Sequence, residues 1–137
     1  MAGDMIVQRS KRVLSQVAGN LTVEDGMIAS DSADGVVRVA GSTLCTGDCI
    51  FDCALQTATL ESRDGNVTVG NLLVERFIRI KEGELHVRGT LSAPRMDVDK
   101  HVQVSGDLTC ADSRVGGSLE VGGKTKADRV SVGGRFV

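Results

Sequence analysis

Apolar and polar residues alternate along the last part of the chain, and the alternation repeats in three blocks of equal length. The blocks cover residues 87–137 and hold 17 residues each: VRGTLSAPRMDVDKHVQ, VSGDLTCADSRVGGSLE and VGGKTKADRVSVGGRFV. Alternation at every second position is typical of strands, whereas a helical repeat needs apolar residues three and four positions apart. The repeat therefore predicts stacked windings of β-strand.

Each block also contains bends. The apolar positions change parity once per block, at Pro94 and in the equivalent places of the next two blocks, and such a change marks a residue that steps out of the pleat. Two further bends are expected at columns of glycine or turn-forming residues: Gly89, Gly106 and Gly123, and the pairs at 99–100, 116–117 and 133–134. Three bends per block predict an all-β fold, a roughly triangular parallel β-solenoid.

Similar columns continue toward the N-terminus with a period of 18 residues. We expect three columns there: Phe51, Val69 and Val87; Leu55, Leu73 and Leu91; and Leu60, Ile78 and Met96. One extra bend residue accounts for the longer period. Windings of 17 to 18 residues predict a solenoid domain over 19–137, clearest over 51–137, with about six to seven windings and a length on the order of 30 Å.

The first 35 residues follow the pattern poorly. Residues 1–18 lack the bend glycines, so we expect an N-terminal tail, a flexible leader or a first strand. Its apolar run Met5, Ile6 and Val7 precedes several basic residues, a combination that could touch a membrane surface or a partner. Residues 19–35 predict one or two imperfect windings with a surface loop that could cap this end.

The amino-acid composition limits the classes of partner that we expect. The chain has 137 residues, 2% aromatic residues, no Trp or Tyr, and a net charge of −2. Stacking platforms for single-stranded nucleic acid and a basic patch for duplex DNA are both missing from the sequence pattern, so no nucleic-acid partner is expected. No stretch resembles a membrane span or a secretory signal, so we expect a cytoplasmic protein.

The cysteines are weighed as metal ligands. Cys45, Cys49 and Cys53 are spaced four apart, and thiolates bind soft metals. The spacing differs from the paired Cys-x-x-Cys of zinc ribbons, and no histidine lies nearby in the sequence. Cys110 takes the slot of Ala93 and Ala127 in the neighbouring blocks, which favours a small buried residue. We therefore expect neither a metal nor another cofactor.

Catalytic residues are not expected either. His86 and His101 fall at outward positions of the repeat. The carboxylates Asp97, Asp99, Asp112 and Asp128 lie at or beside bends, where Asp is a turn former. The sequence contains no Gly-x-Ser-x-Gly, no phosphate-binding loop and no His-Glu-x-x-His.

The ends of a solenoid expose backbone that is not paired, and such edges recruit other strands. The last block keeps its apolar pattern to the final residue, so Phe136 and Val137, together with Val130 and Val132, are predicted as an interface. Either the natural chain continues beyond Val137 or this end stacks on another subunit. Repeated end-to-end stacking that does not close makes a filament.

The motif V-x-G-x-L-x-A-x-x-x-x-V-G-G, seen in GDLTCADSRVGGSLEVGGKTKADRVSVGGRFV, resembles the bactofilins, which are polymer-forming cytoskeletal proteins. The resemblance covers about residues 36–137 and is strongest over the last 51. It implies a right-handed β-helix that polymerises without nucleotide into non-polar filaments, which scaffold other proteins. It also implies membrane association through a short N-terminal tail, and no catalytic residues.

Two other functions remain open. One is a β-solenoid interaction module that does not polymerise, such as a fragment of a longer protein or an adhesin-like domain. The other is an acyltransferase of the hexapeptide type, because VGGSLE and VGGKTK look like hexapeptide units. Those enzymes use a left-handed coil with regular six-residue sides and a catalytic histidine in a loop between subunits. The handedness of the coil therefore separates this alternative from the bactofilin resemblance.

Overall fold

The structure is a computed structural model that describes residues 5–31, 33 and 35–136. These residues form 18 strands and no helix. The strands are β1 (Met5–Gln8), β2 (Lys11–Leu14), β3 (Gln16–Val17), β4 (Leu21–Glu24), β5 (Met27–Ser30), β6 (Val36–Val39), β7 (Ser42–Thr46), β8 (Cys49–Asp52), β9 (Ala54–Arg63), β10 (Val67–Val69), β11 (Leu72–Lys81), β12 (Leu85–Val87), β13 (Leu91–Val98), β14 (Val102–Val104), β15 (Leu108–Val115), β16 (Leu119–Val121), β17 (Thr125–Lys126) and β18 (Arg129–Val132).

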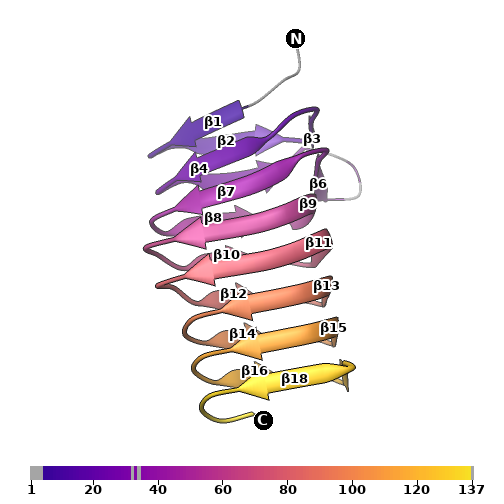
Figure 1. Ribbon diagram of the computed structural model, residues 1–137. Coiled ribbons are helices and arrows are strands. Elements are labelled where there is room, and N and C mark those ends of the chain that lie inside the picture. Colours follow the sequence, from indigo (N-terminus) through magenta and orange to yellow (C-terminus); the bar gives the residue numbers. More distant parts are fainter. Residues whose placement is uncertain (1–4, 32, 34, 137) are drawn as a thin grey trace.

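The strands stack as a β-solenoid of about seven windings, which confirms the fold class expected from the repeat. All strand pairs are parallel, and each strand pairs with its equivalents in the windings before and after it. In Figure 1 the chain descends from the N-terminal end, runs to the left on the near face and returns to the right behind it. This path is a right-handed coil, with β1 and β18 at opposite ends of the stack.

Every complete winding has three sides. We number the sides in chain order, so that the first bend precedes the first side, the second bend separates the first and second sides, and the third bend separates the second and third sides. The longer strands β9, β11, β13 and β15 belong to an 11-stranded sheet and cover the first and second sides. The 7-stranded sheet from β2 to β16 forms the third side. The burial pattern of β13 alternates, but Pro94 and Arg95 are both exposed, and Ala111 and Asp112 interrupt β15 in the same way. The predicted parity change is therefore a bend inside one long strand.

The core is one continuous column of side chains from the inner positions of all three sides. It is built mainly from Val, Leu and Ile with a few Cys and single Phe, Ala and Met residues, and it reaches from Val7 to Leu119. Two of its lines follow the predicted columns, which are Phe51, Val69 and Val87, and Leu60, Ile78 and Met96. A third line joins Val67, Leu85 and Val102.

The extra residue of the 18-residue windings lies partly at the third bend, between the second and third sides. Ile80 and Leu85 are five positions apart, whereas their partners Val98 and Val102 are four apart. Glu82 lies at this longer bend with a φ of 56°, as does Asp64 in the preceding winding. A side chain with Cβ rarely adopts this conformation, so the sequence pattern alone did not locate the bend there.

The predicted place of Leu73 in the core is wrong. Leu72 pairs with both Leu55 and Leu91 and is 2% exposed, whereas Leu73 points outward and is 43% exposed. The first bend is one residue shorter in this winding, and the next bend is one residue longer, as the register shift between Val74 and Phe77 records. The two changes cancel over the whole winding, so a period of 18 hides them.

The predicted tail also needs correction. Residues 5–17 form β1, β2 and β3, which pair with β4, β5 and β6 as a first winding. Its third bend uses Arg9 with a φ of 47° where later windings carry other residues, so the absence of glycine did not prevent winding. The irregular stretch before Val36 lengthens one winding to 22 residues, from Leu21 to its partner Thr43. This winding has the first winding on one side and later windings on the other, so it does not cap the stack.

Candidate self-association surface

The last described winding leaves its inner side chains uncovered. Phe136 continues the buried column of Val102 and Leu119 and is joined to Leu119 by a single parallel bridge, yet it is 46% exposed. Val130 pairs with the buried Ser113 and is 37% exposed. Both side chains thus stand at core positions without a further winding above them among the described residues.

The other predicted interface residues lie in the same layer or outside the described part. Val132 pairs with Val115 and packs against the core while remaining half-buried. Val137 lies outside the described residues.

The backbone of this layer is open as well. Among the described strands, β17 and β18 pair only with β15, so their opposite edges carry peptide groups without a strand partner. An open edge beside exposed apolar side chains is a template for another chain. We call this layer, formed by β17, β18 and Phe136, the C-terminal end face.

The opposite end differs in charge. Arg12 pairs with Ile28, which pairs with Phe51, so a cation occupies the position that is apolar and buried in the next two windings. Arg9 and Lys11 are exposed in the same winding. An inward-pointing charge is one way in which natural sheets prevent association at an edge. The sequence pattern alone does not reveal this role of Arg12, because residues 1–18 lack the bend glycines that would mark a winding.

The residues expected to form a membrane or partner tail are separated by strand alternation. Val7 is 1% exposed and belongs to the core, Met5 packs against the core, and Ile6 is 63% exposed on the outside. Only Ile6 of the three can therefore contact a surface without unfolding β1. The segment is thus a strand of the first winding, and its contact with a membrane surface or a partner stays a prediction that rests on Ile6.

Comparisons with family models, with curated proteins and with solved structures find no match to this chain. The resemblance to bactofilins thus rests on the repeat motif, and it stays a prediction. No helix is present in the described part of the chain, so none is long and apolar enough to cross a membrane.

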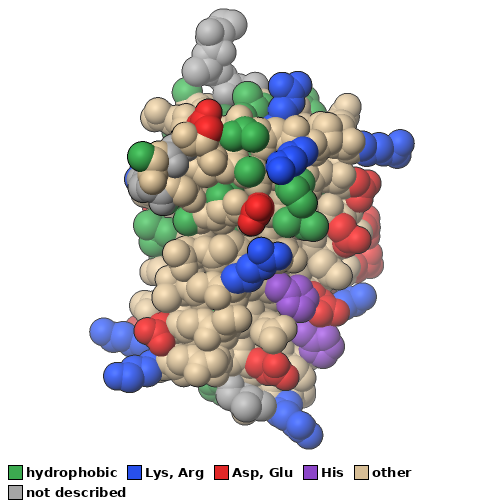
Figure 2. Space-filling view, turned by 180° about the vertical axis from the view of Figure 1, so that it is seen from behind, with side chains coloured by type: hydrophobic (Ala, Val, Ile, Leu, Met, Phe, Trp, Pro, Cys, Tyr) green, Lys and Arg blue, Asp and Glu red, His purple; other side chains and the backbone are tan. Residues whose placement is uncertain are grey.

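The outer face of the third side carries a smaller apolar patch near the N-terminal end. Figure 2 shows apolar side chains gathered in the upper part of this face, with the two histidines lower down. The patch contains Val13, which is 52% exposed, and Ile50, which is 36% exposed. Single exposed apolar residues are common on soluble proteins, and this patch is interrupted by Asp52.

The cysteines are mostly buried and free. Cys45 and Cys49 are in hydrogen-bonding contact inside the third bend, and this contact raises the pKa of the Cys45 thiol and lowers the pKa of the Cys49 thiol. Burial raises the pKa of Cys53, and also that of Cys110, to about 11. Cys53 is separate from this pair, and its thiol donates a hydrogen bond to the carbonyl oxygen of Ile28 at 3.8 Å. In residues 5–31, 33 and 35–136, no three metal-binding side chains are placed to hold an ion.

The histidines have structural contacts. His86 Nε2 lies 3.3 Å from Glu84 Oε1 and its Nδ1 lies 3.3 Å from Gln103 Oε1. His101 Nδ1 accepts a hydrogen bond from the Ser118 amide. Both rings lie on the outside of the solenoid beside a shallow groove. In the described contacts, no serine hydroxyl or cysteine thiol that could act as a nucleophile is bonded to either ring.

Proposed function

We propose that this chain is a structural scaffold protein that assembles with itself end to end, without nucleotide, through the C-terminal end face. The exposure of Phe136 at a position that is fully buried one winding earlier carries the proposal. A second subunit placed there would cover apolar side chains and offer strand partners to β17 and β18 in one step. Both gains favour association.

The two end faces support a preferred first contact. The C-terminal face presents Phe136 and Val130, whereas the N-terminal face places Arg12 over its core column. Covering Arg12 with an apolar end would bury a charge that has no ion-pair partner among the described residues, which is costly. We therefore infer that the C-terminal end face makes the tighter contact, and that any contact at the N-terminal face is weaker.

The experiment is electron microscopy and sedimentation of the purified protein without nucleotide, beside Phe136→Arg. We expect assemblies for the parent and their loss for a variant that keeps its β-type circular dichroism. Lys126→Ala changes an exposed side chain of the same winding and serves as the matched control, with assembly retained. Monodisperse single particles of the parent at high concentration would overturn the proposal.

A β-solenoid interaction module that does not polymerise is the second candidate, and it is favoured if the parent remains a monomer. The right-handed path and the unequal bends differ from the left-handed, regular coil of hexapeptide acyltransferases. The contacts of His86 and His101 described above give no support to that enzymatic alternative.

A further inference from the structure

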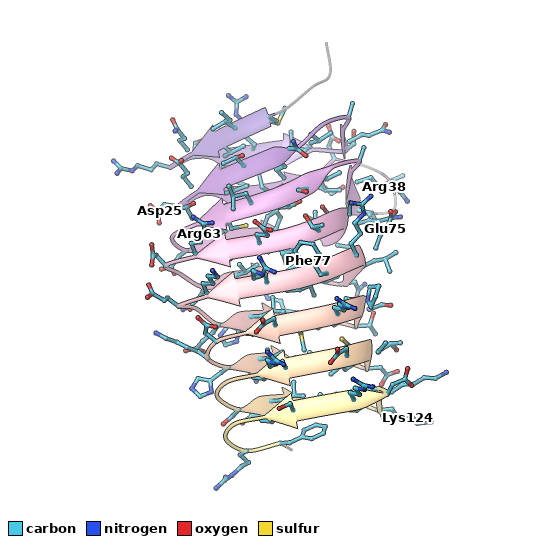
Figure 3. All side chains as sticks on the ribbon, in the orientation of Figure 1. Asp25, Arg38, Arg63, Glu75, Phe77 and Lys124 are labelled. Atoms are coloured by element: carbon cyan, nitrogen blue, oxygen red, sulfur yellow. The ribbon has the colours of Figure 1, made fainter. Side chains whose placement is uncertain are left out.

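A row of charged residues covers the outer face of the second side toward the C-terminal end. Phe77 marks this face on the near side of the stack, over β11 (Figure 3). A groove of about 370 Å³ runs between the side chains there. The residues that line it are Phe77, Ile78, Arg79, Arg95, Met96, Asp97, Asp112 and Arg114. We call their outward-pointing members, without the buried Ile78 and Met96, the charged face.

Strand register arranges these charges as a checkerboard. Down one column, Arg79 pairs with Asp97 and Asp97 pairs with Arg114. Down the neighbouring column, Arg95 pairs with Asp112, and Asp112 pairs with Arg129 in the last winding. The sign therefore alternates along the stack and also along each strand, because Arg95 and Asp97 share β13 while Asp112 and Arg114 share β15.

The charges of this face are not consumed by close ion pairs within the chain. No salt bridge within 4.0 Å joins these arginines and aspartates in the part of the chain that the structure describes. The Arg79 guanidinium instead lies 5.4 Å from the centre of the Phe77 ring. All five charged side chains of the groove are exposed, so a partner can reach them.

We propose that the charged face binds the same face of a second copy of this chain. A two-fold axis parallel to the stack brings each strand opposite the same strand of the partner, with its two outward positions exchanged. Arg95 then meets the partner's Asp97, and Asp112 meets the partner's Arg114. Phe77 meets the partner's Arg79, which preserves a cation–π contact. Every row is thus complementary to itself, as an isologous interface requires.

The same geometry argues against a ligand of one charge. A polyanion on the charged face would lie against Asp97 and Asp112, and a polycation would lie against its three arginines. Only a partner whose charges alternate with the same spacing satisfies both signs. The identical face of another copy provides that spacing, because the same strand separation sets it.

This lateral contact is independent of end-to-end stacking, because it uses the side of the solenoid. Its test is therefore carried out in the 137-residue chain with Phe136→Arg, so that the end contact does not contribute. One variant makes the face basic through Asp97→Lys and Asp112→Lys. The other makes it acidic through Arg79→Glu, Arg95→Glu and Arg114→Glu. Circular dichroism and thermal unfolding verify the fold of both.

Sedimentation velocity then measures association at low and high salt. We expect the Phe136→Arg protein to form dimers at about 0.1 M salt, with an apparent Kd that rises roughly tenfold or more at about 1 M salt, where the Debye length falls from about 10 Å to about 3 Å. Each one-sign variant should remain monomeric alone, and an equimolar mixture should form heterodimers. If a one-sign variant does not fold, a neutral double variant replaces it. These double variants are Asp97→Asn with Asp112→Asn, and Arg95→Gln with Arg114→Gln. Each should weaken the dimer.

Three results would overturn the proposal. The first is a monomeric Phe136→Arg protein at low salt, even if the parent forms filaments. The second is dimerisation of either one-sign variant as strong as that of its background. The third is a mixture of the two one-sign variants that stays monomeric. A dimer that forms in this background while the parent makes no filaments would instead refute only the end-stacking proposal.

Discussion

The backbone amide of Ser118 donates a hydrogen bond of 2.9 Å to Nδ1 of His101, one winding earlier. The same bend position uses other acceptors elsewhere in the stack. Asp48 Oδ1 accepts from the Asn66 amide, and Asn66 Oδ1 accepts from the Glu84 amide, each at 3.0 Å. At the third bend, side chains therefore complete the backbone ladder where the sheet hydrogen bonds stop.

Replacing His101 should reveal this role. His101→Ala removes the acceptor for the Ser118 amide and should lower the free energy of unfolding by about 1 kcal/mol. His101→Asn offers an amide oxygen of the kind that Asn66 uses and should recover most of the loss. Urea unfolding followed by circular dichroism measures both. Equal free energies of unfolding for His101→Ala and His101→Asn would contradict the structural role, because a histidine without this hydrogen bond would give no difference between the two variants.

The register of the later windings could be predicted because bends of constant length keep equivalent residues at a constant period. Val98, Val115 and Val132 illustrate this, since each bend between them has the same number of residues. The place of Leu73 could not be predicted, because two bends changed length in opposite directions. Periodicity reports only the sum of the bend lengths within a winding.

The candidate surfaces were predictable to different degrees. The exposed Phe136 follows from extending a core column to the last winding, so the sequence pattern found it. The role of Arg12 at the other end could not be predicted, because a charged residue at a core position interrupts the apolar pattern and therefore hides the winding. The charged face needed the register across strands, because Arg79 and Asp97 are distant in sequence and adjacent only after stacking.

Val115→Asp tests the core register directly. Val115 is 1% exposed and stands between Val98 and Val132. A carboxylate there would be buried without a partner, and we expect a loss of more than about 3 kcal/mol that abolishes folding. Lys126→Ala, at an exposed position, should change stability by less than about 0.5 kcal/mol. Chemical denaturation compares them, and a stably folded Val115→Asp protein would contradict the register.

Ser113→Ala should stabilise the protein. The Ser113 hydroxyl is buried and has no hydrogen-bond partner among the described residues, and it lies between Met96 and Val130. Removing an unsatisfied buried polar group recovers its desolvation cost, which is about 1 kcal/mol or more. Ser131→Ala, at an exposed position of the next winding, is the control and should be neutral. A loss of stability in the Ser113 variant would indicate that its hydroxyl has a partner, such as a buried water.

Glu82→Gln should stabilise the protein at neutral pH and much less in acid. A hydrogen bond with Asp64, followed by the negative charge of Asp64, raises the pKa of the Glu82 carboxyl. Because the folded-state pKa is raised, the folded chain holds this proton more tightly than the unfolded chain, and the favourable contact is lost as the pH rises through that value. At neutral pH the two carboxylates repel each other. Gln keeps a donor for Asp64 and removes the repulsion.

Thermal unfolding between about pH 4 and about pH 7 should show a gain in Tm that grows with pH, whereas Glu120→Gln on the third side should show no such trend. An equal Tm difference at every pH would contradict the proposed coupling between Glu82 and Asp64.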